Sequence, residues 1–273
     1  MSLESTSRRD SRGVKRFRSV LAVVGFALWF VALVPPLAQW SRQYEYVQAI
    51  QFCVFAMLAP ALLVTGAPWG RLGLASTEAH IVTADGVVVS PRHPRLIDRV
   101  VMSRRNQTGH VRAVTVGLVF VALVIFWRSA PVVDTLVRDP WLVIVESLTL
   151  VGGGVVFWTE LAESPPLSPG SSRPYRIGMS AVSMWVVWIV AYLNGLSYSS
   201  WYGAFHHVAG RGVSLSADQQ FTSGVMWLLS ASAFMPIVFW NLIHWLQSEE
   251  DHDEELHRIV RDDKILGKFD TNI

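Results

Sequence analysis

The chain has 273 residues, of which 51% are hydrophobic and only 16% are charged. A soluble domain carries about 25% charged residues, so this composition excludes a soluble globular protein as well as a disordered chain. The single cysteine, Cys53, cannot form an internal disulfide, which excludes a disulfide-stapled mini-domain. We therefore predict an all-α, polytopic transmembrane helical bundle.

About six membrane spans are predicted in chain order. A hydrocarbon core about 30 Å thick needs roughly 20 apolar residues in a helix. The stretches that meet this requirement are 19–40, 46–66, 111–130, 141–161, 177–196 and 219–246. They form a membrane domain over residues 19–247, which follows a basic N-terminal segment (1–18) and precedes a charged tail (248–273). The tail is predicted to continue as a polar helix.

The distribution of Lys and Arg predicts that both termini are cytoplasmic. With the N-terminus inside, all but four of the 23 Lys and Arg residues fall on the inner side, as the positive-inside rule requires. The four on the outer side are Arg42, Arg128, Arg138 and Arg211. In this orientation residues 70–110 form a cytoplasmic loop and residues 198–217 form an outer loop. The expected location is the cell (plasma) membrane, in contact with membrane lipids.

The cytoplasmic loop contains a predicted β-hairpin and a basic run. Alternating residues at 80–84 precede Asp85-Gly86, and Val87-Val88-Val89 follow; an Asp-Gly pair between β-branched residues is typical of a tight hairpin turn. The basic run at 92–105 is expected to lie against anionic lipid headgroups.

Several polar side chains fall within the outer third of the predicted spans. Glu146 lies five residues after Trp141, hence about 7–8 Å below the outer interface. Gln48 and Gln51 enter the second span from the same side and, being three residues apart, share one helix face. An ionisable group at membrane depth is costly and marks a candidate functional site.

The outer ends of the fifth and sixth predicted spans carry further polar residues. Asn194 lies near the outer end of the fifth span, and Asp218 and Gln219 open the sixth. Two interpretations remain open for the whole group: a hydrogen-bond network between helices, or a small site for a cation or a partner protein. The inner halves of the spans are expected to be apolar packing.

Two pairs of residues carry side chains that could bind a metal. His206 and His207 lie in the outer loop, and imidazole suits copper or zinc, although two histidines do not complete a site. Cys53 and Met57 would offer soft sulfur ligands, but they face away from Gln48 on their own helix. We therefore expect Cys53 and Met57 to pack in the interior.

Small residues and a proline suggest how the helices pack. Gly152-Gly153-Gly154 in the fourth span and Gly224 in the sixth should permit close approach of neighbouring backbones. Pro236 should kink the sixth span.

Short motifs along the chain resemble those of the CtaG-like cytochrome c oxidase assembly factors of bacteria. The matching stretches are Pro35-Pro36-Leu37, the run from Met57 to Leu63 with Gly66-Ala67-Pro68, Gly154-Val155-Val156-Phe157-Trp158 with Pro165-Pro166, and Asp218-Gln219-Gln220 with Gly224 and Met226-Trp227. They occur in order and cover most of the chain outside the inner loop and the tail. The resemblance implies a protein of the bacterial inner membrane, with oxidase subunits as partners and Asp218, Gln219, Met226 and Trp227 among its site residues.

The resemblance fails at the residues expected to hold metal. The family is thought to help insert copper into the oxidase, and its second-span motif resembles His-x-x-Gln-His. Here those positions read from Gln48 to Gln51-Phe52, and a further family histidine would fall at Ser147. Gln and Phe do not form a metal pair. The family also usually has seven spans, whereas six are predicted here.

Three functions remain in competition. The first is an assembly or accessory factor of the respiratory chain's cytochrome c oxidase, acting as a scaffold or placing copper from the outer side. The second is a structural protein that binds another membrane complex without a metal role. A small permease ranks last, because it would need polar residues through the whole membrane. The sequence has no nucleophile and base at a catalytic spacing and no nucleic-acid module, so neither enzymatic activity nor nucleic-acid binding is expected.

Overall fold

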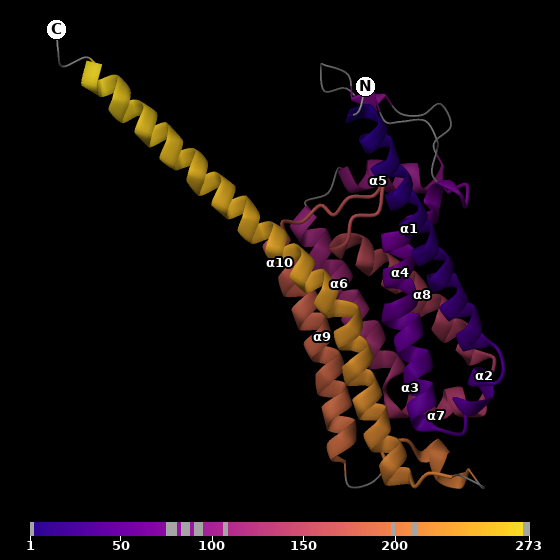
Figure 1. The fold of residues 1–273 in the computed structure, drawn as a ribbon. Coiled ribbons are helices and arrows are strands. Elements are labelled where there is room, and N and C mark those ends of the chain that lie inside the picture. The colour runs from indigo at the N-terminus through magenta and orange to yellow at the C-terminus, as the bar shows by residue number, and fades with distance from the viewer. Residues whose placement is uncertain are drawn as a thin grey trace.

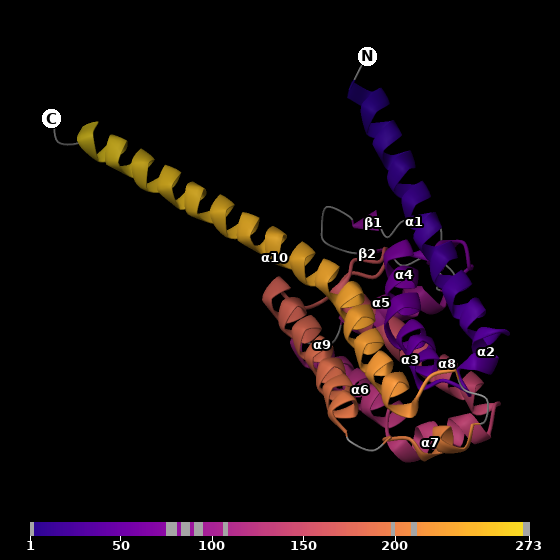
Figure 2. The ribbon, with the colours of Figure 1, turned by 60° about the horizontal axis from the view of Figure 1, so that its bottom comes forward.

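The computed structural model describes residues 3–74, 81–82, 88–89, 95–105, 109–197, 200–208 and 212–269. In these ranges long helices run side by side in a bundle (Figures 1 and 2). The first helix begins, and the last helix ends, beyond the same end of the bundle, which we call the terminal end. The opposite end, called the loop end, holds three short helices: α2 (Leu37–Trp40), α7 (Ala130–Arg138) and the 3₁₀-helix η3 (Gly203–His207).

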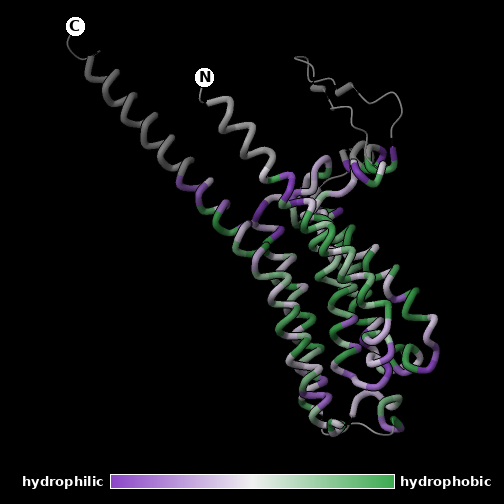
Figure 3. The backbone as a smooth tube through the Cα atoms, turned by 45° about the vertical axis from the view of Figure 1, so that its right-hand side comes forward, coloured by the Kyte–Doolittle hydropathy of each residue, from purple (hydrophilic) through white to green (hydrophobic). Residues whose placement is uncertain are grey.

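The described chain contains six helical stretches that are long and apolar enough to cross a membrane, which confirms the predicted count. They are Gly13–Leu33, Glu45–Gly66, Gly109–Trp127, Leu142–Leu161, Arg173–Leu196 and Leu215–Glu250. The elements that contain them are α1 (Leu3–Leu33), α3 (Glu45–Cys53) with the π-helix η1 (Val54–Leu58) and α4 (Ala59–Gly66), α6 (Gly109–Trp127), α8 (Leu142–Leu161), α9 (Arg173–Leu196) and α10 (Leu215–Phe269). Hydrophobic residues dominate the middle of these helices, and hydrophilic residues gather toward the two ends (Figure 3).

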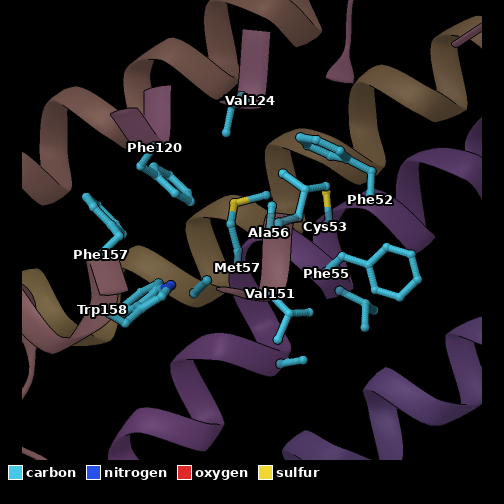
Figure 4. Close-up of a cluster of buried hydrophobic side chains, with 14 of the residues drawn as sticks. Phe52, Cys53, Phe55, Ala56, Met57, Phe120, Val124, Val151, Phe157 and Trp158 are labelled. Carbon is cyan, nitrogen blue, oxygen red and sulfur yellow. The ribbon is translucent and has the colours of Figure 1, made fainter. Parts of the chain in front are cut away.

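The second span lies at the centre of the bundle. Of its most apolar window 78% is buried, far more than in any other span, because α1, α8 and α10 all pack against it. Cys53 and Met57 are fully buried there among aromatic side chains such as Phe52 and Phe157 (Figure 4). This is the packing role expected for both sulfur-containing residues.

Two glycines allow the second span to approach its neighbours closely. A Cβ on Gly66 would lie 2.6 Å from the backbone nitrogen of Ala22 in α1. A Cβ on Gly154 in α8 would lie 2.6 Å from Pro60 and 2.8 Å from the carbonyl oxygen of Ala56. The prediction of close approach is therefore confirmed for Gly154. It is wrong for Gly152 and Gly224, where a Cβ would meet nothing within 4 Å.

Span boundaries differ from the prediction where prolines interrupt the chain. The first span was expected to end near residue 40, but α1 ends at Leu33 and a separate turn of helix, α2, follows Pro35-Pro36. Proline lacks an N–H and restricts the residue before it, so α1 cannot continue through this pair. Pro236 lies inside α10, which continues past it.

The polar segments at the terminal end have the secondary structure that the sequence predicts. Strands β1 (Ile81–Val82) and β2 (Val88–Val89) pair antiparallel, with Ile81 opposite Val89, as expected for the hairpin; the turn at Asp85-Gly86 lies outside the described residues. Part of the basic run forms α5 (Leu96–Arg105), after the short 3₁₀-helix η2 (Pro68–Gly70) and β2. The tail continues as helix to Phe269, and residues 270–273 lie outside the described chain.

Candidate functional site

The start of the sixth span is bonded to the start of the second. The carboxylate of Asp218, in the first turn of α10, accepts the backbone N–H of Glu45 at 2.9 Å and that of Tyr46 at 3.0 Å. These are the first two residues of α3, whose N–H groups have no acceptor within the helix. Asp218 therefore caps the N-terminus of α3. Such a cap usually comes from the residue just before the helix, but here it comes from a distant part of the sequence.

The fifth span joins the same group through amides. Asn194, near the end of α9, donates from Nδ2 to Oε1 of Glu45 at 2.9 Å. Gln219 donates from Nε2 to the backbone oxygen of Asn194 and, at 3.2 Å, to that of Ser197. Three spans that are distant in sequence are thus bonded together at the loop end.

Beside this group, Gln48 stands between a buried cation and a buried carboxylate. Its side-chain oxygen accepts a hydrogen bond from Nη1 of Arg128, and its Nε2 donates to Oε1 of Glu146 at 3.5 Å. The three side chains are almost fully buried, and Glu146 has no exposed surface. Arg128 is also near enough to interact electrostatically with Glu45. We call Glu45, Gln48, Arg128, Glu146, Asn194, Asp218 and Gln219 the loop-end cluster.

Arg128 also contacts two aromatic rings. Its guanidinium carbon lies 5.5 Å from the ring centre of Phe52 and 5.0 Å from that of Tyr202, within the range of a cation–π interaction. The Tyr202 hydroxyl donates to the backbone oxygen of Arg128 at 3.1 Å. Burial raises the pKa of the Tyr202 phenol, and the positive charge of Arg128 opposes that shift. Tyr202 therefore donates this hydrogen bond as the neutral phenol.

Two short helices cover the cluster at the loop end. Val133 of α7 packs with Tyr202 and Phe205 around η3, and the backbone N–H of Ala204 donates to Asp134 of α7 at 2.9 Å. We call α7 and η3 the loop-end cap. Because Tyr202 is bonded to Arg128, the cap is attached to the cluster beneath it.

The loop-end cluster has buried polar atoms without a hydrogen-bond partner. They are Oε2 of Glu146, Oδ1 of Asn194 and the Nε and Nη2 atoms of Arg128. An unpaired buried polar atom costs about 1–3 kcal/mol, and more when it is charged. The cluster is therefore less completely satisfied than a network that serves packing alone.

The structure brings most of the predicted polar residues together. Gln48 and Glu146 are bonded directly, Asn194 and Asp218 are both bonded to Glu45, and Gln219 is bonded to Asn194. Gln51 is buried but separate, since its Nε2 donates to the backbone oxygen of Ala32 in α1 at 2.6 Å. None of the residues predicted from the second, fourth, fifth and sixth spans at this depth faces the lipid.

The remaining predicted residues lie apart from the cluster. Met226 is fully buried in the apolar core, whereas Trp227 is 53% exposed on the surface of α10. The Trp227 ring stacks on Trp188 of α9, with centroids 4.9 Å apart. The association of Met226 and Trp227 with a polar site therefore stays a prediction.

His206 and His207 are both exposed on η3, with ring centroids 6.4 Å apart. Over the described part of the chain, no group of three or more His, Cys, Asp or Glu side chains is arranged to hold a metal ion. Two exposed imidazoles do not make a complete copper site. The residues present therefore do not fit the metal that the family resemblance implies.

Sequence reasoning missed Arg128 as a cluster residue. It counted Arg128 only as an outer-side charge at the end of the predicted third span (111–130), whose charge-free stretch ends at Trp127. A signal was present, since Arg128 is one of only four basic residues assigned to the outer side. A basic residue there is unusual and calls for a partner.

The expectation that the other half of the bundle is purely apolar is wrong. Glu160, at the terminal end of α8, is fully buried and accepts two hydrogen bonds from Arg112, at 3.0 and 3.1 Å. Nη2 of Arg104 lies 3.1 Å from the same carboxylate and donates to Thr159 at 2.6 Å. We call Arg104, Arg112, Thr159 and Glu160 the terminal-end cluster.

The terminal-end cluster joins a loop helix to two spans. Burial lowers the pKa of the Arg104 guanidinium, the charge of Glu160 opposes this shift, and Arg112 adds to it. The cluster could not be predicted from sequence, because Glu160 and Arg112 each lie at the edge of a span, where a charged side chain is normally expected to be in contact with solvent. Only the packing of α6 against α8 brings them together.

Comparison with known proteins gives one match. Residues 3–248 match the family model described as cytochrome c oxidase caa3 assembly factor (Caa3_CtaG). No curated protein and no solved structure matches the chain.

Proposed function

Because the chain belongs to the cytochrome c oxidase caa3 assembly factor family, we propose that it assists assembly of the oxidase as a membrane scaffold that does not itself carry copper. The membership covers the whole membrane domain and the beginning of the tail. The proposal concerns what this particular chain does within that family.

The position of Arg128 carries the proposal. The resemblance places two family histidines at Gln48 and Phe52, and the Arg128 guanidinium contacts both side chains. A fixed positive charge therefore occupies the space between the two positions that would hold a copper ion. A cation in a buried site of low dielectric strongly opposes the entry of a second cation.

The loop-end cap is the surface that we propose for contact with an oxidase subunit. Arg128 holds the cap from below through Tyr202, and Asp134 of α7 joins the two helices of the cap by accepting the backbone N–H of Ala204. Next to the cap, Trp141 is 63% exposed, and His206 and His207 are also accessible. Exposed aromatic and imidazole side chains on a rigid support are typical of protein contacts.

The proposed orientation places the loop end outside the cytoplasm. Its support is the distribution of Lys and Arg, most of which lie in the segments attached to the terminal end. The scaffold would then act on the outer side of the cell membrane, with both termini in the cytoplasm.

A complementation experiment tests the scaffold. Deleting the gene should lower the amount of assembled haem–copper oxidase, and adding copper to the medium should not restore it. The wild-type chain and the control Arg16→Gln, an exposed change in α1 away from the loop-end cap, should restore assembly, whereas Arg128→Gln should not. Unchanged oxidase content after deletion, or full rescue by copper alone, would contradict the proposal.

A gain-of-binding experiment tests the role of Arg128. The purified wild-type chain from copper-fed cells should contain far less than one copper per chain. The combined changes Gln48→His, Phe52→His and Arg128→Leu restore two imidazoles and remove the fixed charge, so bound copper should rise severalfold. The control retains Arg128 and has the two histidines alone, and it should stay near background. Stoichiometric copper in the wild-type chain would refute the copper-free scaffold.

A further inference from the structure

A deep apolar groove opens between α1 and α10 at the terminal end of the bundle. Its volume is about 850 Å³, within the range of roughly 300–1,000 Å³ typical of ligand sites. The two helices diverge there (Figures 1 and 2), and α4 and α8 form the floor. The groove is far from the loop-end cluster, so the proposed function does not account for it.

Helical periodicity builds the walls of the groove. On α1 the lining residues include Phe17 and Leu21, and on α10 they include Ser232 and Pro236; in each pair the residues are four apart and share a face. The small side chain of Ser232 leaves space that a larger residue would fill. On the floor, Leu58 lies eight residues before the end of α4, so the groove descends roughly 12 Å into the bundle.

The rim of the groove carries a net positive charge. Arg18 of α1 and Arg176 of α9 both line it, together with one acidic residue, Glu163. Arg176 is held in place because it donates to the backbone oxygens of Ser171 at 2.9 Å and Pro169 at 3.4 Å. Two guanidinium groups above an apolar channel complement a molecule that has an anionic head and a hydrocarbon tail.

We propose that this groove binds an anionic phospholipid, with the phosphate at Arg18 and Arg176 and an acyl chain between α1 and α10. Basic pockets between membrane helices bind such headgroups, and the apolar walls match an acyl chain. A transmembrane helix of a partner would not use the basic rim, so the charge pattern favours the lipid.

Native mass spectrometry of the full chain tests the proposal. The protein is exchanged into nanodiscs that contain phosphatidylglycerol and phosphatidylcholine in equal amounts, and the lipids that remain bound after gentle release are counted. We expect phosphatidylglycerol to be retained selectively. Arg18→Gln should weaken its retention about fivefold, and Ser232→Trp, which fills the groove from an exposed position, should abolish it.

Two variants serve as matched controls. Arg16→Gln removes an exposed charge from α1 beside the groove, and Thr115→Trp adds the same bulk to an exposed position on α6. Both should retain phosphatidylglycerol as the wild type does. Equal retention of the two lipids would overturn the proposal, as would retention unaffected by both groove variants or a co-purifying polypeptide in place of the lipid. Oxidase assembly is not measured, so the result is independent of the scaffold proposal.

Discussion

At the terminal end, Glu160 receives two hydrogen bonds from Arg112 and lies 3.1 Å from Arg104. At the loop end, the amide of Gln48 stands between Arg128 and Glu146, and one carboxylate oxygen of Glu146 has no hydrogen-bond partner. Both clusters hold a buried carboxylate of α8 near an arginine supplied by α6 or the turn that follows it. Of these two α8 carboxylates, only Glu160 has a hydrogen-bond partner for each oxygen.

This difference separates a structural pair from a candidate site. A bidentate arginine–carboxylate pair is strong and geometrically specific, and it fixes α5, α6 and α8 to one another. The terminal-end cluster leaves one buried atom, Nη1 of Arg104, without a partner, whereas the loop-end cluster leaves four, one of them on its α8 carboxylate. Unused hydrogen-bonding capacity on this scale lowers stability, which is typical of functional sites. We therefore expect the terminal-end cluster to govern folding and the loop-end cluster to govern oxidase assembly.

The largest effect on stability should come from Glu160→Gln. The change leaves two partly buried arginines without the buried carboxylate, and breaking a buried pair costs up to about 3–5 kcal/mol. Thermal unfolding in detergent should show a large fall in Tm, and the protein level in the membrane should drop. Glu163→Gln, an exposed change three residues later, is the control. A Glu160→Gln variant as stable as the wild type would contradict a structural role for the terminal-end cluster.

Glu146→Gln should have a smaller effect on stability and a larger one on assembly. The new amide can still accept from Gln48, but the buried Arg128 loses its nearest acidic neighbour in α8. A buried polar group that is left less well compensated costs about 1–3 kcal/mol, so Tm should fall less than for Glu160→Gln. Oxidase content, measured at matched protein level, should decrease. Normal assembly with reduced Tm would make the loop-end cluster structural too.

Asp218→Ala should have a moderate effect, because it removes the cap of α3. The loss of a helix cap costs about 0.5–2 kcal/mol. The measurement is thermal unfolding, with Gln220→Ala, an exposed change two residues later, as the control. Equal Tm values for the two variants would show that the backbone bonds from Glu45 and Tyr46 contribute nothing to stability.

The smallest effect is expected for His206→Ala combined with His207→Ala. Both rings are exposed on η3, so Tm should be unchanged, and oxidase assembly should fall only slightly, because the two rings are a small part of the proposed contact surface. A strong loss of assembly would move the working site from the buried cluster to the surface of η3. Copper content measured on the same variant would show whether metal binding is the reason.

Much of the bundle could be predicted from sequence, because membrane spans depend on length and hydrophobicity alone. Depth was predictable as well: Gln48, Glu146 and Asp218 were placed at the same level of the membrane, and they do lie together at the loop end. Counting residues from an interface gives this depth directly, since each helical residue rises 1.5 Å.

Pairing between helices could not be predicted in the same way. Arg128 and Glu160 sit at the ends of spans, where hydropathy cannot distinguish a solvated charge from a buried one. Their burial depends on which helices are neighbours and on how each is rotated about its axis. The loop-end cap could not be predicted for a related reason, since α7 is a short amphipathic helix between the predicted third and fourth spans.

Helix α10 extends from the loop end of the bundle to beyond its terminal end. It is a single helix from Leu215 to Phe269, 55 residues long, which corresponds to about 82 Å. Asp218, the cap of α3, sits in its first turn, and its last turns project far beyond the terminal end (Figure 1). A tilt of one degree about its first turn would displace its other tip by about 1.4 Å. One continuous helix therefore connects the residue that caps the second span with the segment that extends beyond the terminal end.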